Sequence, residues 1–178
     1  MTSNFRFISY NENYEPLLKQ VKDNPDDWRA VSTYENTGGN KNPYGFLPLI
    51  MAVVNDEFPE PKNTEMLRPS PMFSKYTAAT DWLKSKGFKT VSRCAFFRIQ
   101  VGGGVGRHID EGTYYLNKDR YHFALQGRYR YECGGEEHII EPGTFFWFDN
   151  KQPHFAENIS DVERITLVFD VPHSPDNP

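Results

Sequence analysis

Between about residue 92 and residue 171 the sequence alternates apolar and polar residues in short runs, and turn signals separate the runs. A period of two is typical of β-strands that bury one face. The runs predict eight strands: Arg93–Val101, Gly106–Asp110, Arg120–Gln126, Arg128–Glu132, Glu137–Glu141, Thr144–Asp149, His154–Asn158 and Arg164–Val171. The segments between them are too short for the crossover helices that an α/β fold requires.

Turn residues between these runs favour antiparallel hairpins. Cys133-Gly134-Gly135 predicts a tight turn between the fourth and fifth strands, and Pro142-Gly143 predicts another turn after the fifth strand. Short antiparallel strands in this number form two sheets whose mouth can hold a ligand. We therefore predict a mainly β protein, a double-stranded β-helix of the jelly-roll or cupin type, with a few N-terminal helices.

The residues before this region are mixed in character. Tyr14–Val21 predicts a short helix, and Tyr76–Lys86 predicts another because its apolar residues recur at helical spacing before Gly87. Residues 35–45 are rich in Gly, Asn and Pro and predict a long loop or lid. Residues 55–72 contain four prolines and predict a largely extended or irregular segment.

Length and composition predict one domain. A chain of 178 residues suits a single core, so we expect residues 1–90 to support a jelly-roll catalytic core at residues 91–172. The net charge of −4 predicts no nucleic-acid partner, and the absence of a long apolar run predicts no membrane association. Cys94 and Cys133, in a sequence without a signal peptide, predict reduced thiols and a cytoplasmic location.

Three residues on the predicted strands have side chains that bind metals. His108 and Asp110 are two positions apart, so on a strand both side chains point to the same face. His154 follows on a later strand. Two imidazoles and one carboxylate form the facial triad of non-haem Fe(II) oxygenases, which leaves coordination positions open for a co-substrate and O₂. The pattern predicts an iron site.

An arginine that could hold a co-substrate follows the second histidine in the sequence. Arg164 lies ten residues after His154, at the start of the last predicted strand. A dicarboxylate that chelates iron through its 2-oxo acid end needs a cation for its far carboxylate, and a guanidinium offers a bidentate fork. An ion pair with Glu163 or Asp161 is the structural alternative for this residue.

These residues lie in segments that resemble the aspartyl/asparaginyl β-hydroxylase family of Fe(II)/2-oxoglutarate-dependent oxygenases, including its bacterial proline hydroxylase-like members. The segments are HID at 108–110, RYHFAL at 120–125 and PGTFFWFDNKQPHFAENISDVERITLVFDV at 142–171. The resemblance covers roughly residues 90–172, and the chain before it matches the family only loosely.

The resemblance implies roles for individual residues. The three candidate ligands would bind iron, and Arg164 would hold the C5 carboxylate of 2-oxoglutarate. Arg120 and His122 match the family's Arg-x-His pair, which contacts carboxylates of co-substrate or substrate. We assign His122 to 2-oxoglutarate binding and Arg120 to substrate binding.

The chain departs from the family's pattern at two places. The eukaryotic aspartyl hydroxylase lacks the carboxylate ligand, whereas Asp110 is present here, which places the chain nearer to the bacterial amino-acid hydroxylases. The second departure is the glycine-rich run at residues 101–106, where the family usually has a Pro-Gly turn.

The function that these patterns indicate is Fe(II)- and 2-oxoglutarate-dependent hydroxylation of an amino acid, free or as a residue of a peptide. Arg107, Arg120 and His122, beside Arg164, would be an excess of cationic groups and favour a substrate with a carboxylate. Arg107 is one residue out of phase with His108, which favours a position facing solvent, so the argument depends on Arg120. The alternative is a catalytically silent cupin that binds a small ligand or a metal in the same mouth.

Overall fold

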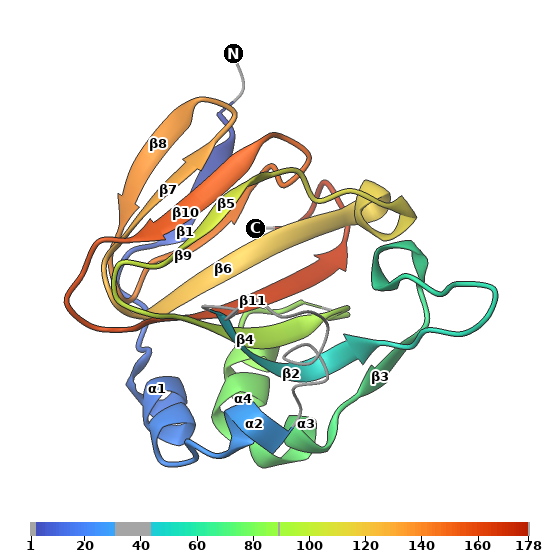
Figure 1. The fold of residues 1–178 in the computed structure, drawn as a ribbon, viewed down its shortest axis with the longest axis horizontal. Helices are drawn as coiled ribbons and strands as arrows, with labels where there is room; N and C mark the ends of the chain where they lie inside the picture. Colours follow the sequence, from blue (N-terminus) through green and yellow to red (C-terminus); the bar gives the residue numbers. More distant parts are fainter. Residues whose placement is uncertain (1–2, 31–43, 89, 178) are drawn as a thin grey trace.

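In the computed structural model, which describes residues 3–30, 44–88 and 90–177, two β-sheets face each other and helices lie behind one of them (Figure 1). The strands are β1 (Phe5–Ser9), β2 (Tyr44–Ala52), β3 (Leu67–Pro69), β4 (Cys94–Ile99), β5 (Gly104–His108), β6 (Lys118–Gln126), β7 (Tyr129–Cys133), β8 (Glu136–Ile140), β9 (Phe145–Phe148), β10 (His154–Asn158) and β11 (Arg164–Pro172). The helices are α1 (Glu15–Lys22), α2 (Asp27–Ala30), α3 (Pro71–Lys75) and α4 (Thr77–Ser85), with 3₁₀ turns η1 (Pro61–Asn63) and η2 (Thr113–Asn117).

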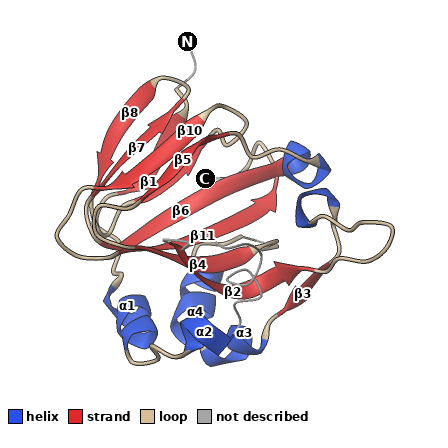
Figure 2. Cartoon of the chain, in the orientation of Figure 1, coloured by secondary structure: helices blue, strands red, loops and turns tan. Residues whose placement is uncertain are grey.

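Within the described residues, the larger sheet has the strand order β1-β9-β6-β11-β4-β2-β3 and the smaller sheet has the order β5-β10-β7-β8. Neighbouring strands in both sheets are antiparallel. Figure 2 shows the strands curving around a shared interior, with α1–α4 gathered at one side. The eight predicted strands correspond to β4–β11, and the predicted mainly β, double-stranded β-helix fold is confirmed.

The N-terminal half contributes more to the sheets than the sequence predicted. β1 pairs with β9 at one edge of the larger sheet, and β2 pairs with β4 near the other edge. Gly45 and Pro48 interrupt the apolar run of β2, and the register with β4 shifts just after Pro48. A proline inside an apolar run argues against a strand unless it lies at such an irregularity. The sequence therefore did not predict β2. The segment at residues 55–72 contains β3 and η1.

The two helices that the sequence predicted are present as α1 and α4. Gly87, just after α4, has a positive φ of 79°, the left-handed conformation expected of a glycine that follows a helix end. Most of the predicted loop at residues 35–45 lies outside the described residues, and residues 44–45 begin β2.

The last strand is buried on both faces. Its side chains alternate between the helix layer and the interior between the sheets. The apolar ones that join the helix-side core are Ile165, Leu167, Phe169 and Val171. The alternate set, Arg164, Thr166, Val168 and Asp170, is also buried. β11 therefore lies on an apolar layer and presents polar groups to the interior.

Aromatic packing holds the helices to the larger sheet. Trp82 of α4 stacks on Phe123 of β6 with ring centroids 4.3 Å apart, and Leu17 and Val21 of α1 are buried in the same cluster. A second cluster, which includes Tyr131 and Phe148, lies in the interior between the sheets. Each buried aromatic side chain removes about 150–250 Å² of surface from water. The high aromatic content thus supplies both layers of the core.

Two further sequence predictions concern membrane association and the state of the cysteines. Among the described residues, no helix has the length and apolar content that a membrane span requires. Cys94 and Cys133 are buried free thiols.

The glycine-rich run before His108 allows β5 to approach β10 closely. A Cβ atom at Gly104 would lie 2.7 Å from the carbonyl oxygen of Ala156 on β10, whereas a Cβ at Gly106 would meet nothing within 4 Å. Only glycine therefore fits at position 104 without moving one of the two strands.

We expect Gly104→Ala to lower the free energy of unfolding by about 1–3 kcal/mol, the usual cost of overpacking. Gly106→Ala is the matched control and should change it by less than about 0.5 kcal/mol. Urea denaturation of both variants measures the difference. Equal stabilities would show that β5 can move away from β10 at no cost.

Candidate metal centre

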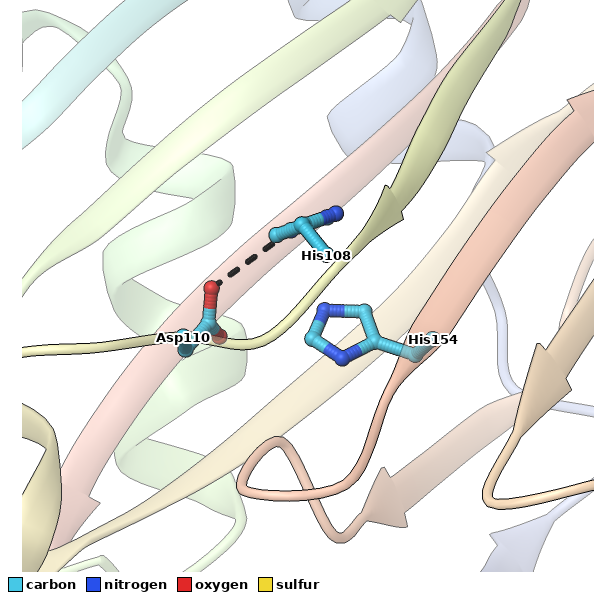
Figure 3. Close-up of side chains that lie close together, drawn as sticks. All are labelled: His108, Asp110 and His154. Carbon is cyan, nitrogen blue, oxygen red and sulfur yellow. Dashed lines mark ion pairs between the residues drawn. The ribbon is translucent and has the colours of Figure 1, made fainter.

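The three candidate ligands converge at the open end of the smaller sheet (Figure 3). His108 at the end of β5 lies directly opposite His154 at the start of β10. Asp110 follows two residues after the end of β5, where its backbone N–H donates to the carbonyl of Asn150 at 3.1 Å. One ligand atom from each of the three residues lies within 4.8 Å of the others, a cluster compact enough to hold one metal ion.

Backbone carbonyls determine which ring nitrogen of each histidine is available. Nδ1 of His108 lies 2.8 Å from the carbonyl of Gly106, and Nδ1 of His154 lies 2.9 Å from the carbonyl of Gln152. A carbonyl can only accept, so each Nδ1 carries the proton and each Nε2 keeps its lone pair. Burial lowers the pKa of His154, which also favours the neutral, metal-binding form.

Hydrogen bonds orient the carboxylate of Asp110. Its Oδ2 accepts from Nη1 of Arg120 at 2.7 Å and from Nδ2 of Asn150 at 3.0 Å, while Oδ1 lies 3.6 Å from Nε2 of His108. Burial alone would raise the pKa of Asp110, but the charge of Arg120, the nearby His108 and the hydrogen bond from Asn150 hold that pKa well below its usual range. The ionised group thus has one oxygen occupied and one facing the histidines.

This donor set suits a divalent transition metal. Two neutral imidazoles and one carboxylate are the ligands of the facial triad, and the fixed tautomers and the held carboxylate are the outer contacts that such ligands require. The residues present therefore fit Fe(II).

Arg120, which we predicted to bind substrate, is already paired with protein carboxylates. Its Nε and Nη2 donate to the two oxygens of buried Asp170 at 2.8 and 3.0 Å, in addition to the contact with Asp110. Tyr114 also donates to Asp170, at 3.1 Å. The argument that Arg120 is an excess cation was therefore wrong, because two carboxylates neutralise it.

Arg107 does not add a cation to the site. Its side chain is about half exposed and forms an ion pair with Glu132. It lies over the ring of Phe155 at 5.0 Å and is not among the residues that line the cavity between the sheets. This position matches its place one residue out of phase with His108.

A cavity of about 390 Å³ opens between the two sheets beside the metal ligands, and Arg164 lies in its wall. Arg164 is only 3% exposed, its Nε donates to Thr166 at 3.0 Å, and its guanidinium lies 3.8 Å from the ring centroid of Tyr129. No carboxylate of the described residues forms an ion pair with it, neither Glu163 nor Asp161. The cavity therefore has a buried cation without a counter-charge.

His122 lies in the same wall, on β6. Burial, with the nearby charges of Arg164 and Arg120, lowers its pKa far below the usual value for histidine, so the ring is neutral at physiological pH. Its Nδ1 is buried and has no hydrogen-bond partner within the described part of the chain. Buried polar atoms are seldom left unpaired, and a ligand in the cavity would satisfy this one.

Sequence analysis missed two residues that shape the centre, Asn150 and Asp170. Asp170 is six residues after Arg164 on the last strand, so strand alternation alone would have placed both on the cavity face. Asn150 lies in the turn between β9 and β10. No local pattern marks it, because its role depends on a segment 40 residues away in the sequence.

Comparison with known proteins gives a family and a partial structural likeness. The model of the family described as Aspartyl/Asparaginyl beta-hydroxylase matches residues 6–174. This match is wider than the resemblance over residues 90–172 and includes β2 and all of β1 except its first residue. No curated protein sequence matches the chain.

Several solved structures share part of the fold. A predicted oxalate decarboxylase from Thermotoga maritima is 17% identical, with 53% of this chain and 74% of that chain covered and a TM-score of 0.40. A cupin protein from Bacteroides fragilis is 16% identical, with 48% and 70% covered and a TM-score of 0.41. A Klebsiella pneumoniae protein with a double-stranded beta-helix domain is 16% identical, with 45% and 62% covered and a TM-score of 0.39. At these identities, activity does not transfer from one protein to another.

The contact between Asn150 and Asp110 generates a prediction about metal affinity. We expect Asn150→Ala to weaken Mn(II) binding by about 10- to 100-fold, the usual effect of removing an outer contact to a ligand. Calorimetric titration of the apoprotein with Mn(II) measures the affinity. Asn24→Ala, which removes an amide that donates to the Gln20 carbonyl far from the centre, is the control and should bind Mn(II) like the wild type. Unchanged affinity in Asn150→Ala would mean that Arg120 alone orients the carboxylate.

Proposed function

Because the chain belongs to the aspartyl/asparaginyl β-hydroxylase family, we propose that it is an Fe(II)- and 2-oxoglutarate-dependent dioxygenase. Its substrate would be an amino acid, free or as a residue of a peptide. The reaction consumes 2-oxoglutarate, O₂ and a C–H bond, and it yields succinate, CO₂ and an alcohol. His108, Asp110 and His154 would hold the metal, which when bound supplies the redox chemistry for C–H oxidation.

Arg164 is the observation that carries the proposal. A buried guanidinium that pairs with no carboxylate of the described residues is costly without an anion, so its place in the cavity wall needs a reason. An anionic ligand in the cavity supplies that reason, and two of the candidate metal ligands, His108 and His154, line the same cavity as Arg164. Thr166 fixes the Nε of Arg164, which leaves the Nη atoms of the guanidinium for the ligand.

The neighbouring side chains support a bound co-substrate in other ways. His122 offers a neutral ring whose Nδ1 has no partner among the described residues and can hydrogen bond to a carboxylate oxygen. Tyr131 and Phe148 pack around His154, with ring centroids 6.2 and 5.0 Å away, and exclude water from that side of the centre. These ring contacts hold the metal ligand His154 in a fixed position.

The direct test is a screen for succinate release with Fe(II), 2-oxoglutarate and a panel of free amino acids and peptides. A substrate that increases succinate formation would support the hydroxylase. If 2-oxoglutarate raised the melting temperature of the Mn(II)-loaded protein but no succinate formed with any member, the silent cupin would be the better description.

Replacing His108, Asp110 or His154 by Ala should abolish both metal binding and succinate release. The melting temperature of the apoprotein should change little, because the jelly-roll core does not include the metal. His173→Ala removes an exposed histidine paired with Asp119 and serves as the control. Activity in Asp110→Ala would exclude the three-residue site and favour one built on two histidines.

Arg164→Leu should raise the apparent KM for 2-oxoglutarate while leaving Mn(II) affinity nearly unchanged. Loss of a buried bidentate contact costs about 2–5 kcal/mol, or roughly 30- to several-thousand-fold. Arg164→Lys should recover only part of the loss, since an ammonium lacks the fork.

Steady-state kinetics on the two variants gives the comparison. Arg128→Leu, an exposed arginine paired with Glu141 at 2.9 Å, is the matched control and should keep the wild-type KM. An unchanged KM in Arg164→Leu would remove the main support for 2-oxoglutarate as the co-substrate.

A further inference from the structure

A second arginine, Arg93, lies in the wall of the cavity, beyond the metal ligands. Arg93, just before β4, lines the same cavity as Arg164. Its carbonyl accepts from the N–H of Asp170 at 2.8 Å, so Arg93 lies beside Asp170 on the sheet. Asp170 is six residues from Arg164 along β11, a separation of about 20 Å on a strand. The two arginines therefore occupy opposite ends of the cavity.

The metal centre is nearer to the Arg93 end. Asp170 lies opposite Arg120 on β6, and Arg120 contacts the metal ligand Asp110 at 2.7 Å. Arg93 flanks Asp170 on the other side, through β4. A ligand held at Arg93 would thus approach the metal from the side away from Arg164.

The guanidinium of Arg93 is held in place by neutral groups. Nη2 donates to the carbonyls of Pro61 and Thr64, the latter at 3.1 Å, and Nη1 donates to the hydroxyl of Tyr115 at 3.3 Å. The group stacks on Tyr114, with its carbon 3.4 Å from the ring centroid. Nε is buried without a partner, and no carboxylate of the described residues forms an ion pair with Arg93. It is pre-positioned but not neutralised.

Among the described residues, the cationic groups around the cavity outnumber the anionic groups by one. Arg120 is neutralised by Asp110 and Asp170. In the proposed function, Arg164 takes one carboxylate of 2-oxoglutarate, and the divalent metal and the dianionic co-substrate cancel as a pair. Three arginines then face two protein carboxylates, Asp110 and Asp170. The unmatched cation is Arg93, a partly buried residue whose Nε is buried, and a charge partly removed from water favours an anion as its neighbour.

The wall next to Arg93 is apolar. Ile50 of β2 lies opposite Cys94, the residue after Arg93, and the lining continues along β2 through Met51 and Ala52. Phe97 of β4 lines the same wall. A ligand at this end would meet one charged group and several hydrophobic side chains, which suits a compact molecule with one anionic group and an apolar body.

We propose that Arg93 anchors the carboxylate of the prime substrate, whose apolar body lies along residues 50–52 of β2. This inference rests on the proposed function and assigns to Arg93 the role that the sequence suggested for Arg120. Arg120 instead positions Asp110, and Arg93 sets specificity for an anionic substrate.

The test compares acids with their neutral-ended partners. Protein loaded with Mn(II) and 2-oxoglutarate, kept without O₂ so that no turnover occurs, is titrated by calorimetry with L-leucine, L-phenylalanine and L-proline and with the C-terminal amide of each. We expect the wild type to prefer the acid for at least one pair. Arg93→Met should weaken acid binding by about 10- to 100-fold and change amide binding by less than about twofold, since a hydrogen bond to a charged group is lost.

Two further variants keep the test decisive. Arg93→Lys retains the charge without the fork and should keep part of the preference, even if Arg93→Met folds poorly. Arg98→Met is the matched control. Arg98 is on β4, the strand that begins just after Arg93, stacks over Trp28 at 4.8 Å and is not in the cavity wall. The acid preference of the Arg98→Met variant should therefore equal that of the wild type.

Two results would overturn the inference: a wild type that shows no acid preference in any pair, or an Arg93→Met variant that weakens acid and amide equally. The second would mean that Arg93 only holds the segment at residues 61–64. Binding of 2-oxoglutarate to the Mn(II)-loaded wild type is measured first. Failure of that step would count against the proposed function, whereas intact 2-oxoglutarate binding without an acid preference would count against Arg93 alone.

Discussion

The guanidinium of Arg120 joins the two sheets of this protein. On one side it forms a fork with Asp170 within the larger sheet, and on the other it holds the oxygen of Asp110 that faces away from the histidines, just beyond the smaller sheet. Removing three charges from water costs about as much as their pairing returns, so such a group contributes geometry more than stability. The metal ligands depend on it, because Asp110 lies past the end of its strand and has no ladder to orient it.

The arrangement is possible because the central strands of the larger sheet have two different faces. On β6 and β11, alternate residues such as Phe123 and Leu167 pack against the helices, and the residues between them face the cavity. The helix-side face secures the sheet through the burial of large apolar groups. The opposite face can then hold His122, Arg164 and Asp170. In a closed apolar core, burial of these polar groups would be costly.

Three arginines divide the cavity into regions with different charge. Arg120 is neutralised by protein carboxylates and belongs to the metal centre, while Arg164 and Arg93, at the two ends, have only neutral partners within the described residues. In the proposed function this division separates co-substrate from substrate, with the metal between them. The aromatic side chains between the sheets keep the interior apolar, and in such surroundings an uncompensated charge selects its ligand strongly.

Consecutive residues determined much of this protein. The period of two predicted the eight strands from β4 to β11, because alternation depends only on the geometry of one strand. The spacing of His108 and Asp110 predicted that they would share a site, although Asp110 lies past the end of β5 and is held by Arg120 and Asn150. Pairing between distant segments decided the rest. It placed β1 and β2 in the larger sheet, gave Asn150 its contact with Asp110, and neutralised Arg120 while giving Arg93 no carboxylate partner among the described residues. Whether a charge is matched depends on which strands become neighbours, and only the tertiary structure specifies that.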